Sequence, residues 1–437
     1  MIQPLPWQPE AIDMQRAAFA RKISFLDGSD TGTGKTYTAC FAAAADRTPL
    51  GVACPISVIP SWIEAAEKTG ATLAFAGNIE ALKRSGTFLR RVAAHRWAWN
   101  LPANCRLIFD EVQRYKSYAT QNGKTLLAAP RPVLMLSATP FGNPIEFRGI
   151  GHQLGLLDWN DFDSWLGRNG CVRGQMGGYE FVGISRVPPG SPPPSPAMLA
   201  AAKAEILDRI HRQIFHTGRG IRIRKADLGD LFPRIRRETR IVPVDNPEAI
   251  DAAYAEELEL LLRSAVSGGV EFLRARQMTE FSMVPSIIEM IHDLHNAGHA
   301  VLVFVNFRDT FRRILEEFPD AARIFGGQEE EGVPREGERK RFAEDRTRTM
   351  LLMLGAGGDG LSAHDLRGEF PRASIIVPGV SAQGVIQADG RDHRGGGLSP
   401  VDHYYLYGDT AMERMRRKKL EAKIGDIGMI VDGDLMP

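Results

Sequence analysis

The sequence predicts an α/β fold with two parallel-sheet lobes and a mostly helical region between them. Short apolar runs alternate with helical stretches over residues 23–141, and a second series of apolar runs begins near residue 299. Such runs are typical of strands that are buried on both faces of a parallel sheet. Residues 197–216 and 247–298 read as mostly helical. We therefore expect lobe 1 at residues 1–155, a helical interlobe region at 156–298 and lobe 2 at 299–437.

The apolar runs of each series end in polar or Gly-rich residues. Ligand sites in open α/β sheets lie at the carboxyl ends of the strands, so a site is expected in these segments. The proline-rich stretch 183–197 predicts a loop within the middle region. The runs are ISFLD, LGVACP, CRLIFDE and PVLMLSATP in the first series, and HAVLVFVN, ARIFGG, RTMLLML, ASIIVP and DHYYLYG in the second.

The composition is typical of a soluble globular protein. Of the 437 residues, 43% are hydrophobic and 24% are charged, and no apolar stretch approaches the ~20 residues that a membrane-spanning helix needs. The first residues lack the pattern of a secretory signal. The four cysteines form no C-x-x-C pair, so we expect reduced cysteines and no zinc site. We expect a cytoplasmic protein, in a bacterium or in the host of a phage.

The net charge of +1 does not by itself mark a nucleic-acid-binding protein. Basic residues do cluster in three short segments, RGIRIRK, PRIRRETR and ERMRRKK. A solvated surface is the common alternative for such charge runs. Within the first cluster, Arg222, Arg224 and Lys225 are the residues for which we predict contact with nucleic acid.

The segment after the first strand, SDTGTGKT, predicts a phosphate-binding loop that opens a helix. Glycines let backbone N–H groups turn toward phosphate oxygens, and the helix N-terminus adds partial positive charge. Lys35 would contact the β- and γ-phosphates of ATP, and the hydroxyl of Thr36 would bind Mg²⁺. Ser29 stands where the strict motif has glycine, and a Gly-rich turn with an incidental lysine is the alternative. The expected ATP site includes Thr31, Gly32, Thr33, Gly34, Lys35 and Thr36.

Two adjacent carboxylates, Asp110 and Glu111, follow the apolar strand in LIFDEVQ. They would repel each other unless a cation or a function compensates. Asp110 is the candidate for anchoring Mg²⁺, directly or through water, and Glu111 for polarising the water that attacks the γ-phosphate. An ordinary acidic helix start is the alternative.

The second strand series carries two further candidate segments. QADGRDHRGG contains Gln387, Arg391 and Arg394, and the two arginines are three residues apart, so they share one side of a helix. Cationic groups of this kind stabilise the charge that spreads over a transferred phosphoryl group. GAGGDGLSAHDL is a second Gly-rich loop, in which Gly360 would allow close approach to ATP or to a phosphate backbone. Surface arginines and a structural turn are the alternatives.

In this order, the segments TGTGKT, CPISVIPSW, FDEVQRYKS, LSATPFGNP, VLVFVNF, GAGGDGL and QADGRDHR resemble the helicase motifs of superfamily two. Further segments narrow the resemblance to the SWI/SNF-type double-stranded-DNA translocases, in a compact bacterial or phage form. These are DEVQRYKS, SATPFGNPIEF, IRIRKADLGDLFP and GDTAMERMRRKKLEAKI. Gln113 departs from the histidine that the DEAH form has at this position. The resemblance implies two RecA-like lobes that use ATP and Mg²⁺.

The resemblance also assigns residues. Gln8 is similar to the adenine-reading glutamine of the family, with Gln15 as the alternative. Gln387, Arg391 and Arg394 resemble the second-lobe motif, with the arginines as finger residues. The segments that usually face the nucleic-acid strand contain Ser57, Trp62 and Asn306.

The function that the resemblance implies is an ATP-dependent DNA translocase or helicase. It would couple ATP hydrolysis at the interlobe cleft to movement on duplex DNA, in replication, recombination or repair. We expect a monomeric motor without a membrane partner. An RNA helicase is one alternative. An ATPase switch that binds nucleic acid and works with a nuclease or replication partner is another.

Overall fold

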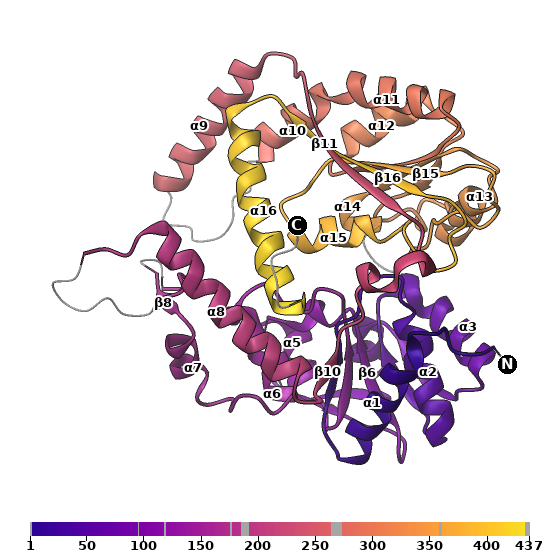
Figure 1. Ribbon diagram of the computed structural model, residues 1–437, viewed down its shortest axis with the longest axis vertical. Helices are drawn as coiled ribbons and strands as arrows, with labels where there is room; N and C mark the ends of the chain where they lie inside the picture. The colour runs from indigo at the N-terminus through magenta and orange to yellow at the C-terminus, as the bar shows by residue number, and fades with distance from the viewer. Residues whose placement is uncertain are drawn as a thin grey trace. The chain divides into compact units, whose positions relative to one another are not determined.

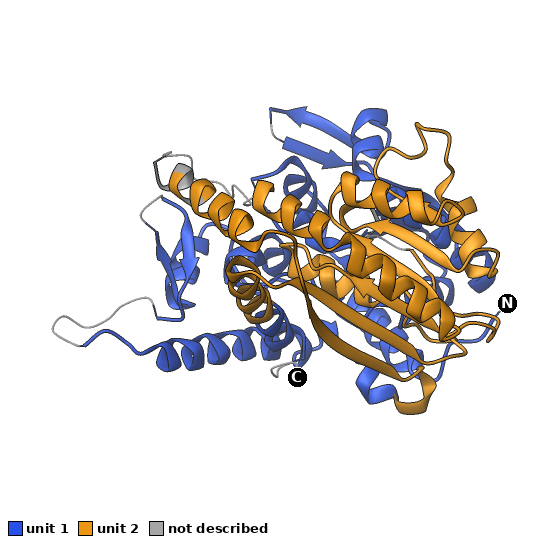
Figure 2. Ribbon diagram, turned by 90° about the horizontal axis from the view of Figure 1, so that it is seen from above, with its two compact units in different colours: residues 1–228, 424–437 blue, residues 229–423 orange. Residues whose placement is uncertain are grey.

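The chain forms two compact units, shown in different colours in Figure 2. Unit 1 comprises Met1–Leu228 and Ile424–Pro437, and unit 2 comprises Gly229–Lys423. The expected α/β fold with two parallel-sheet lobes is confirmed. The computed structural model describes residues 2–94, 96–117, 119–174, 177–184, 192–263, 273–357 and 361–432.

The middle of the chain, residues 156–298, is divided between the two units rather than forming a region of its own. The reason lies in the basic segments, which contain strands that the sequence analysis did not predict. Strand β10 (Gly220–Ile221) pairs with the sheet of unit 1, and strand β11 (Ile235–Val242) pairs with the sheet of unit 2. The helices of this middle part that precede β10 therefore belong to unit 1, and those of the middle part that follow β11 belong to unit 2.

Unit 1 contains a six-stranded, all-parallel sheet with the order β10-β1-β7-β6-β2-β3 (Figure 1). All four strands of the first predicted series are present, and β3 and β10 extend the sheet at its two edges. The strands are β1 (Phe25–Asp27), β2 (Leu50–Ala53), β3 (Leu73–Gly77), β6 (Arg106–Asp110), β7 (Val133–Leu136) and β10; two hairpins pair β4 (Leu89–Ala93) with β5 (Arg96–Trp99) and β8 (Cys171–Arg173) with β9 (Tyr179–Phe181).

The two faces of this sheet are covered by different side chains. Ile108 faces a core that α1, α2 and α3 complete, whereas its neighbour Phe109 packs edge-on against Trp99 and Tyr115. This alternation follows from the two-residue period of a strand. The helices of unit 1 are α1 (Gln8–Ala20), α2 (Lys35–Asp46), α3 (Ile59–Thr69), α4 (Ile79–Ser85), α5 (Gln121–Leu127), α6 (Arg148–Gln153), α7 (Phe162–Arg168) and α8 (Pro196–Phe215).

Unit 2 contains a second six-stranded parallel sheet, with the order β11-β16-β15-β12-β14-β13. All five strands of the second predicted series are present. The added strand β11 runs parallel to β16 from the pair Ile235–Val401 to the pair Val242–Gly408. The strands are β11, β12 (Ala300–Val305), β13 (Ala322–Ile324), β14 (Thr349–Met353), β15 (Arg372–Ile376) and β16 (Val401–Gly408).

Helices cover both faces of this sheet (Figure 1). Val301 and Val303 of the central strand pack with α11 and α12, and Leu302 and Phe304 pack with α13, α14 and α15 on the opposite face. The helices of unit 2 are α9 (Pro247–Arg263), α10 (Leu273–Ser282), α11 (Val284–Asn296), α12 (Arg308–Glu317), α13 (Arg335–Ala343), α14 (Leu354–Gly357) and α15 (Ala382–Asp389); α16 (Ala411–Asp432) begins in unit 2 and ends in unit 1.

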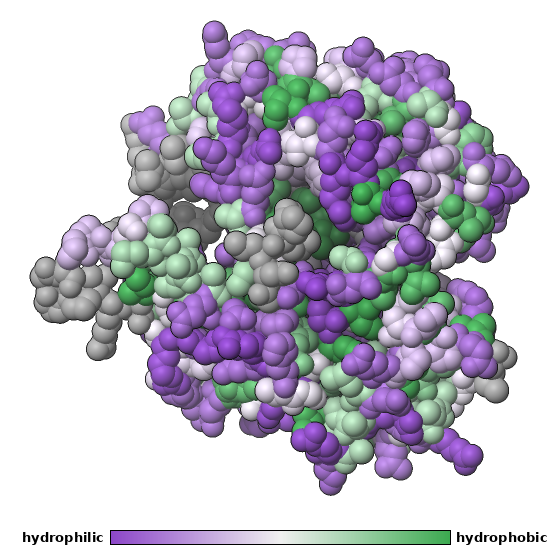
Figure 3. All heavy atoms as spheres, in the orientation of Figure 1, coloured by the Kyte–Doolittle hydropathy of each residue, from purple (hydrophilic) through white to green (hydrophobic). Residues whose placement is uncertain are grey.

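Hydrophilic side chains cover most of the face shown in Figure 3, and the hydrophobic ones form small patches among them. None of the described helices combines the length with the apolar character that crossing a bilayer requires.

Candidate functional site

The predicted phosphate loop joins strand β1 to helix α2 in unit 1. Gly32 and Gly34 have φ angles of 83° and 87°, which side chains other than hydrogen disfavour. A Cβ atom on Gly34 would lie 2.5 Å from Nε2 of Gln8. The Nζ atom of Lys35 donates to the carbonyl oxygens of Ser29 and Asp30, at 2.7 and 2.9 Å. The loop therefore forms a narrow cradle that only glycine permits, with the lysine folded into it.

The half-buried Lys35 lies among carboxylates. Burial lowers the pKa of its ammonium, and the nearby Asp27, Glu111 and Asp110 offset part of this shift. Strands β1 and β6 end at Asp27 and Asp110, and β7 separates them in the sheet. The structure thus brings the predicted lysine and the predicted acidic pair together at the carboxyl edge of one sheet.

Asp27 is a member of the site that the sequence analysis missed. Its carboxylate accepts hydrogen bonds from the backbone N–H of Ser29 at 3.0 Å and from Nε2 of Gln15 at 3.2 Å. Burial raises the pKa of Asp27, while Lys35 acts in the opposite direction. An acidic residue at the end of an apolar strand, directly before the glycines, was the signal that could have identified it.

Each residue of the acidic pair is held by a specific side chain. Nε1 of Trp62 donates to Oδ2 of Asp110 at 2.8 Å, and Nε2 of Gln113 donates to Oε2 of Glu111 at 2.7 Å. Burial and the charge of Glu111 raise the pKa of Asp110 to about 7. Gln113, the departure from the DEAH form, therefore orients the carboxylate that is predicted to polarise water.

The donor set fits ATP with Mg²⁺. A divalent cation would compensate the repulsion that raises the pKa of Asp110, and Mg²⁺ commonly binds through one or two protein oxygens together with phosphates. The residues that would hold it are Thr36, at the start of α2, and Asp110. Lys35 and the backbone of the glycine cradle would hold the phosphates. Bound Mg²⁺ would supply charge neutralisation at the phosphate oxygens.

Gln8 contacts the phosphate loop directly. Its Nε2 donates to the carbonyl oxygen of Gly34 at 3.1 Å, and its Oε1 accepts from the backbone N–H of Leu5 at 2.8 Å. The neighbouring Trp7 donates from Nε1 to the carbonyl oxygen of Thr33 at 2.9 Å. Gln15, the alternative, is fully buried and bound to the carboxylate of Asp27. Gln8 is itself 1% exposed, so its contact with a base stays a prediction. Thr31 and Gly32 are half-buried in the loop.

The basic segment at residues 220–225, here called the strap segment, is bound to the phosphate loop. Backbone hydrogen bonds join Gly28 to Ile221 and Asp30 to Ile223, and Ser29 Oγ accepts from the N–H of Ile223 at 3.1 Å. Ser29, which stands where the strict motif has glycine, therefore helps to hold the strap segment against the phosphate loop.

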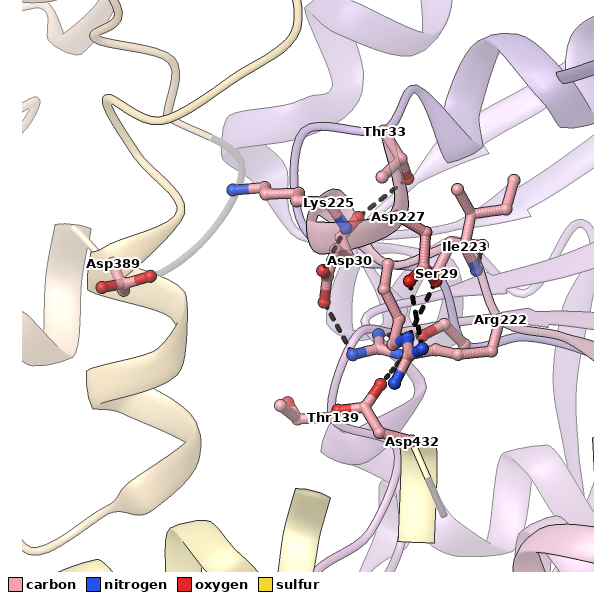
Figure 4. A network of polar contacts seen from close by, with 12 residues as sticks. Ser29, Asp30, Thr33, Thr139, Arg222, Ile223, Lys225, Asp227, Asp389 and Asp432 are labelled. Carbon is pink, nitrogen blue, oxygen red and sulfur yellow. Dashed lines mark hydrogen bonds and ion pairs between the residues drawn. The ribbon is translucent and has the colours of Figure 1, made fainter. Parts of the chain in front are cut away.

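Arg222 is the centre of this arrangement. Its guanidinium forms ion pairs with Asp30 and with Asp432 at the end of α16, both at 2.7 Å, and donates to the carbonyl oxygen of Gly28 at 2.5 Å (Figure 4). The Arg222 side chain is only 9% exposed. Burial alone would raise the pKa of Asp30, but Arg222 and the N–H of Lys225 hold it below its usual value.

These contacts correct two assignments to the nucleic-acid face. Arg222 is buried between carboxylates, so it stabilises the phosphate loop and does not present its charge to a strand. Trp62 is fully buried and donates to Asp110. Trp62 was assigned by the family resemblance, but its ring packs in the core of unit 1.

The remaining nucleic-acid candidates are more accessible. Ser57 is half-buried in a short 3-10 turn after β2, Arg224 pairs with Asp227, and Lys225 is half-buried. Asn306 follows β12 and donates from Nδ2 to Glu280 at 2.7 Å and to the carbonyl oxygen of Val377 at 3.0 Å. For these residues, contact with nucleic acid stays a prediction.

In unit 2, the two predicted finger arginines converge on one carbonyl oxygen. Arg391 and Arg394 both donate to the oxygen of Leu361, at 3.4 and 2.8 Å. Arg391 is 2% exposed, Arg394 is half-buried and Gln387 is 8% exposed. Gly360 lies outside the described residues. Their roles in catalysis stay predictions.

A buried histidine anchors this segment to the sheet of unit 2. The two ring nitrogens of His403 lie 2.7 Å from Asp389 and 2.7 Å from Asp392, the residues on either side of Gly390 and Arg391. Burial alone would lower the pKa of His403, but the two carboxylates raise it to about 10. Arg237 of β11 adds a bidentate contact to Asp389. No sequence pattern indicated this cluster, because the three side chains come from two separate elements.

No family model matches the chain. A candidate ATP-dependent RNA helicase of Acanthamoeba polyphaga mimivirus is 28% identical over 447 residues, covering 94% of this chain and 80% of that protein. The solved structure of S. cerevisiae Dbp5 bound to RNA and ADP BeF3 is 10% identical with a TM-score of 0.54, covering 97% of this chain and 88% of that chain. This likeness concerns the fold alone.

A further solved structure, the Sulfolobus solfataricus SWI2/SNF2 ATPase core in complex with dsDNA, is 16% identical with a TM-score of 0.38. It covers 99% of this chain and 94% of that chain. At this score the similarity adds no argument about the branch.

The Arg222→Ala substitution should destabilise unit 1 and impair ATP hydrolysis in the absence of nucleic acid. Removing one partner of a buried ion pair leaves uncompensated charge and costs about 3–5 kcal/mol. Urea unfolding and basal ATPase assays measure both effects. The matched control is Arg224→Ala, whose exposed pair with Asp227 should contribute less than about 1 kcal/mol. Normal stability and basal turnover in Arg222→Ala, with loss of nucleic-acid binding alone, would restore the original interpretation.

The His403→Gln substitution should lower the free energy of unfolding by about 3–5 kcal/mol near pH 6, because two buried carboxylates lose their shared cation. The folded pKa of about 10 lies above the ordinary value of 6.5. This contribution is therefore complete below pH 6.5 and declines as pH rises through 10. Urea titrations of both proteins at several pH values test it, with the exposed His292→Gln as the control. If the difference in unfolding free energy between the wild type and His403→Gln did not change with pH, His403 would not be charged in the folded protein.

Proposed function

We propose that this chain, a superfamily-two helicase-type ATPase, couples ATP hydrolysis to movement along duplex DNA. The observation that carries the ATPase assignment is the meeting of Lys35, Asp110 and Glu111 at the carboxyl edge of the unit 1 sheet. A Gly-rich cradle, a half-buried cation and two held carboxylates are the groups that phosphoryl transfer from ATP requires. The motif order along the chain and the RecA-like fold support the same class.

The proposed roles follow from the contacts in unit 1. Lys35 binds the β- and γ-phosphates, and Thr36 and Asp110 hold Mg²⁺. Glu111, oriented by Gln113 at 2.7 Å, polarises the attacking water. Arg391 and Arg394 remain the proposed cations that stabilise charge on the transferred phosphoryl group.

The choice of duplex DNA rests on the segments that resemble SWI/SNF-type translocases. Two of them, DEVQRYKS and SATPFGNPIEF, are joined in unit 1 by an ion pair between Lys116 and Glu146 at 2.6 Å. Glu146 also accepts from the backbone N–H of Gly142 at 2.8 Å, and Asn143 caps the turn that contains Glu146. Two of the segments on which the branch resemblance rests are therefore in contact within unit 1.

An RNA helicase is the second candidate function. The observation in its favour is that the mimivirus relative is described as a candidate RNA helicase and aligns with 94% of this chain. The two functions differ in the polymer that stimulates the ATPase, so one set of assays separates them.

Glu111→Gln should retain ATP affinity while turnover falls by about 10²–10⁴-fold, because water activation is lost and Asp110 still holds the cation. Lys35→Ala should lose hydrolysis altogether. Nucleotide titration and steady-state turnover are measured on both variants, with Glu67→Gln on the exposed side of α3 as the control. If Glu111→Gln lost affinity and turnover together, the proposed division of roles would be wrong.

Duplex DNA should stimulate ATP hydrolysis more strongly than matched single-stranded DNA or RNA, with little dependence on sequence, because backbone contacts carry no sequence information directly. The stimulation should fall steeply as salt rises, since each phosphate contact releases counterions. Lys35→Ala is the control that should show no response. Equal or greater stimulation by RNA would favour the RNA helicase, and no stimulation by any polymer would favour the ATPase switch.

A further inference from the structure

Unit 2 contains a cavity of about 180 Å³ that none of the assigned functions uses. Its walls come from α9, α10, α16 and the loop that follows β15. The aliphatic and aromatic part of its lining is formed by Tyr254, Met412, Met415 and Leu420. One water molecule needs only about 10–15 Å³, so the cavity has room for a much larger group.

The charged side chains that line this cavity are all cationic among the described residues. They are Arg276, Arg416, Lys419 and Lys423. Arg276 is 5% exposed and lies over the ring of Phe307, whereas the two lysines are exposed on α16.

Two described carboxylates lie beside the lining: the buried Glu413 pairs with Arg416 at 3.2 Å, and Asp251 accepts from the N–H of Met412 at 3.2 Å. None of the residues that line the cavity is acidic among those that the structure describes, and Lys419 and Lys423 are exposed cations of the lining. The cationic side chains of the lining would therefore favour the binding of an anionic ligand.

The spacing along α16 directs one stripe of side chains into the cavity. Residues 412, 416, 419 and 423 are three or four positions apart, so they lie on the same side of a helix. Lys418, which directly precedes Lys419 on α16, is exposed but does not line the cavity. The basic residues of α16 are therefore divided between the cavity and the outer surface.

The cavity lies where a ligand is expected in an α/β sheet. Gly379 and Val380 follow β15, and Asn306 follows the neighbouring β12, so both segments are at the carboxyl edge of the unit 2 sheet. A Cβ atom on Gly379 would lie 2.8 Å from Oδ1 of Asn306. The cavity wall is therefore in direct contact with a residue predicted to face nucleic acid.

We propose that this cavity binds one nucleotide of the nucleic-acid strand. Its phosphate would contact Arg416, Lys419 and Lys423, and its sugar would pack against the apolar wall formed by Tyr254 and Met415. The combination of cationic and apolar groups matches the phosphate and the sugar of a strand, which a protein can bind without reading sequence. The inference rests on the proposed function, because it assumes that nucleic acid is the polymer bound.

The first test compares two double variants on the same helix. Lys419→Ala/Lys423→Ala removes two cavity lysines, and Arg414→Ala/Lys418→Ala removes two exposed cations outside the cavity. Anisotropy titrations of a fluorescein-labelled DNA duplex over a range of salt give the dissociation constant and its salt dependence. The cavity variant should bind more weakly at low salt, and its log–log slope should be shallower by about 1.8, at about 0.9 per contact. The control should keep the wild-type slope.

The outcomes separate the two proposals. If wild-type ATPase responds to no nucleic acid, the proposed function fails and this inference fails with it. If the wild type binds the duplex and the cavity variant keeps its slope, only the cavity assignment is overturned. Thermal melting of each variant confirms that its fold is intact.

The second test locates the bound nucleotide. Duplex DNA that carries 5-iododeoxyuridine is irradiated with the wild-type protein, and cross-linked peptides are identified by mass spectrometry. Cross-links to the peptides that contain Tyr254 or Met415 support the proposal, and cross-links only elsewhere overturn it. If instead an acidic peptide with a central phenylalanine binds the wild type but not the cavity variant, and DNA binding is unchanged, the cavity is a protein-docking site.

Discussion

The ion pairs that Arg222 makes with Asp30 and Asp432 are the interaction on which the nucleotide site depends. A loop rich in glycine gains freedom in the unfolded chain and needs external support to keep one shape. Here the support is the strap segment, which binds the loop through backbone hydrogen bonds and through one buried guanidinium. Because Asp432 ends α16, the last described turn of the chain takes part in holding a loop near its beginning. The phosphate cradle is therefore a product of three distant segments.

Both units hold charged side chains in places that are shielded from water. In unit 1, the half-buried Lys35 lies near several carboxylates, and burial together with the charge of Glu111 raises the pKa of Asp110 to about 7. That imbalance suits a site that receives a cation and a polyphosphate. In unit 2, His403 is fully compensated by Asp389 and Asp392, which suits a structural anchor beside the arginine motif. The acidic pair, whose charge is not balanced, is therefore suited to binding a ligand, whereas the His403 cluster, whose charge is balanced, is suited to structural support.

The sequence was sufficient for the nine strands of the two predicted series, the phosphate loop and the acidic pair, because apolar periodicity and local motifs encode them. It was insufficient for Arg222, whose partners Gly28 and Asp432 are 194 and 210 positions away. A basic cluster looks the same in sequence whether it faces solvent, a strand or buried carboxylates. The same ambiguity concealed β10 and β11, so the expected boundaries at 155 and 298 differ from the change of unit after Leu228. Trp62 was assigned only through the family resemblance, which carries no information on the burial of its ring in this chain.

Triplex displacement measures whether ATP hydrolysis drives movement along duplex DNA. A labelled third strand is bound to a DNA duplex, and its release is followed on a gel after addition of the protein with ATP. We expect release that requires ATP and is lost in Lys35→Ala, while the two duplex strands stay paired. Failure to displace the third strand, together with ATP-dependent separation of a partial RNA duplex, would contradict it.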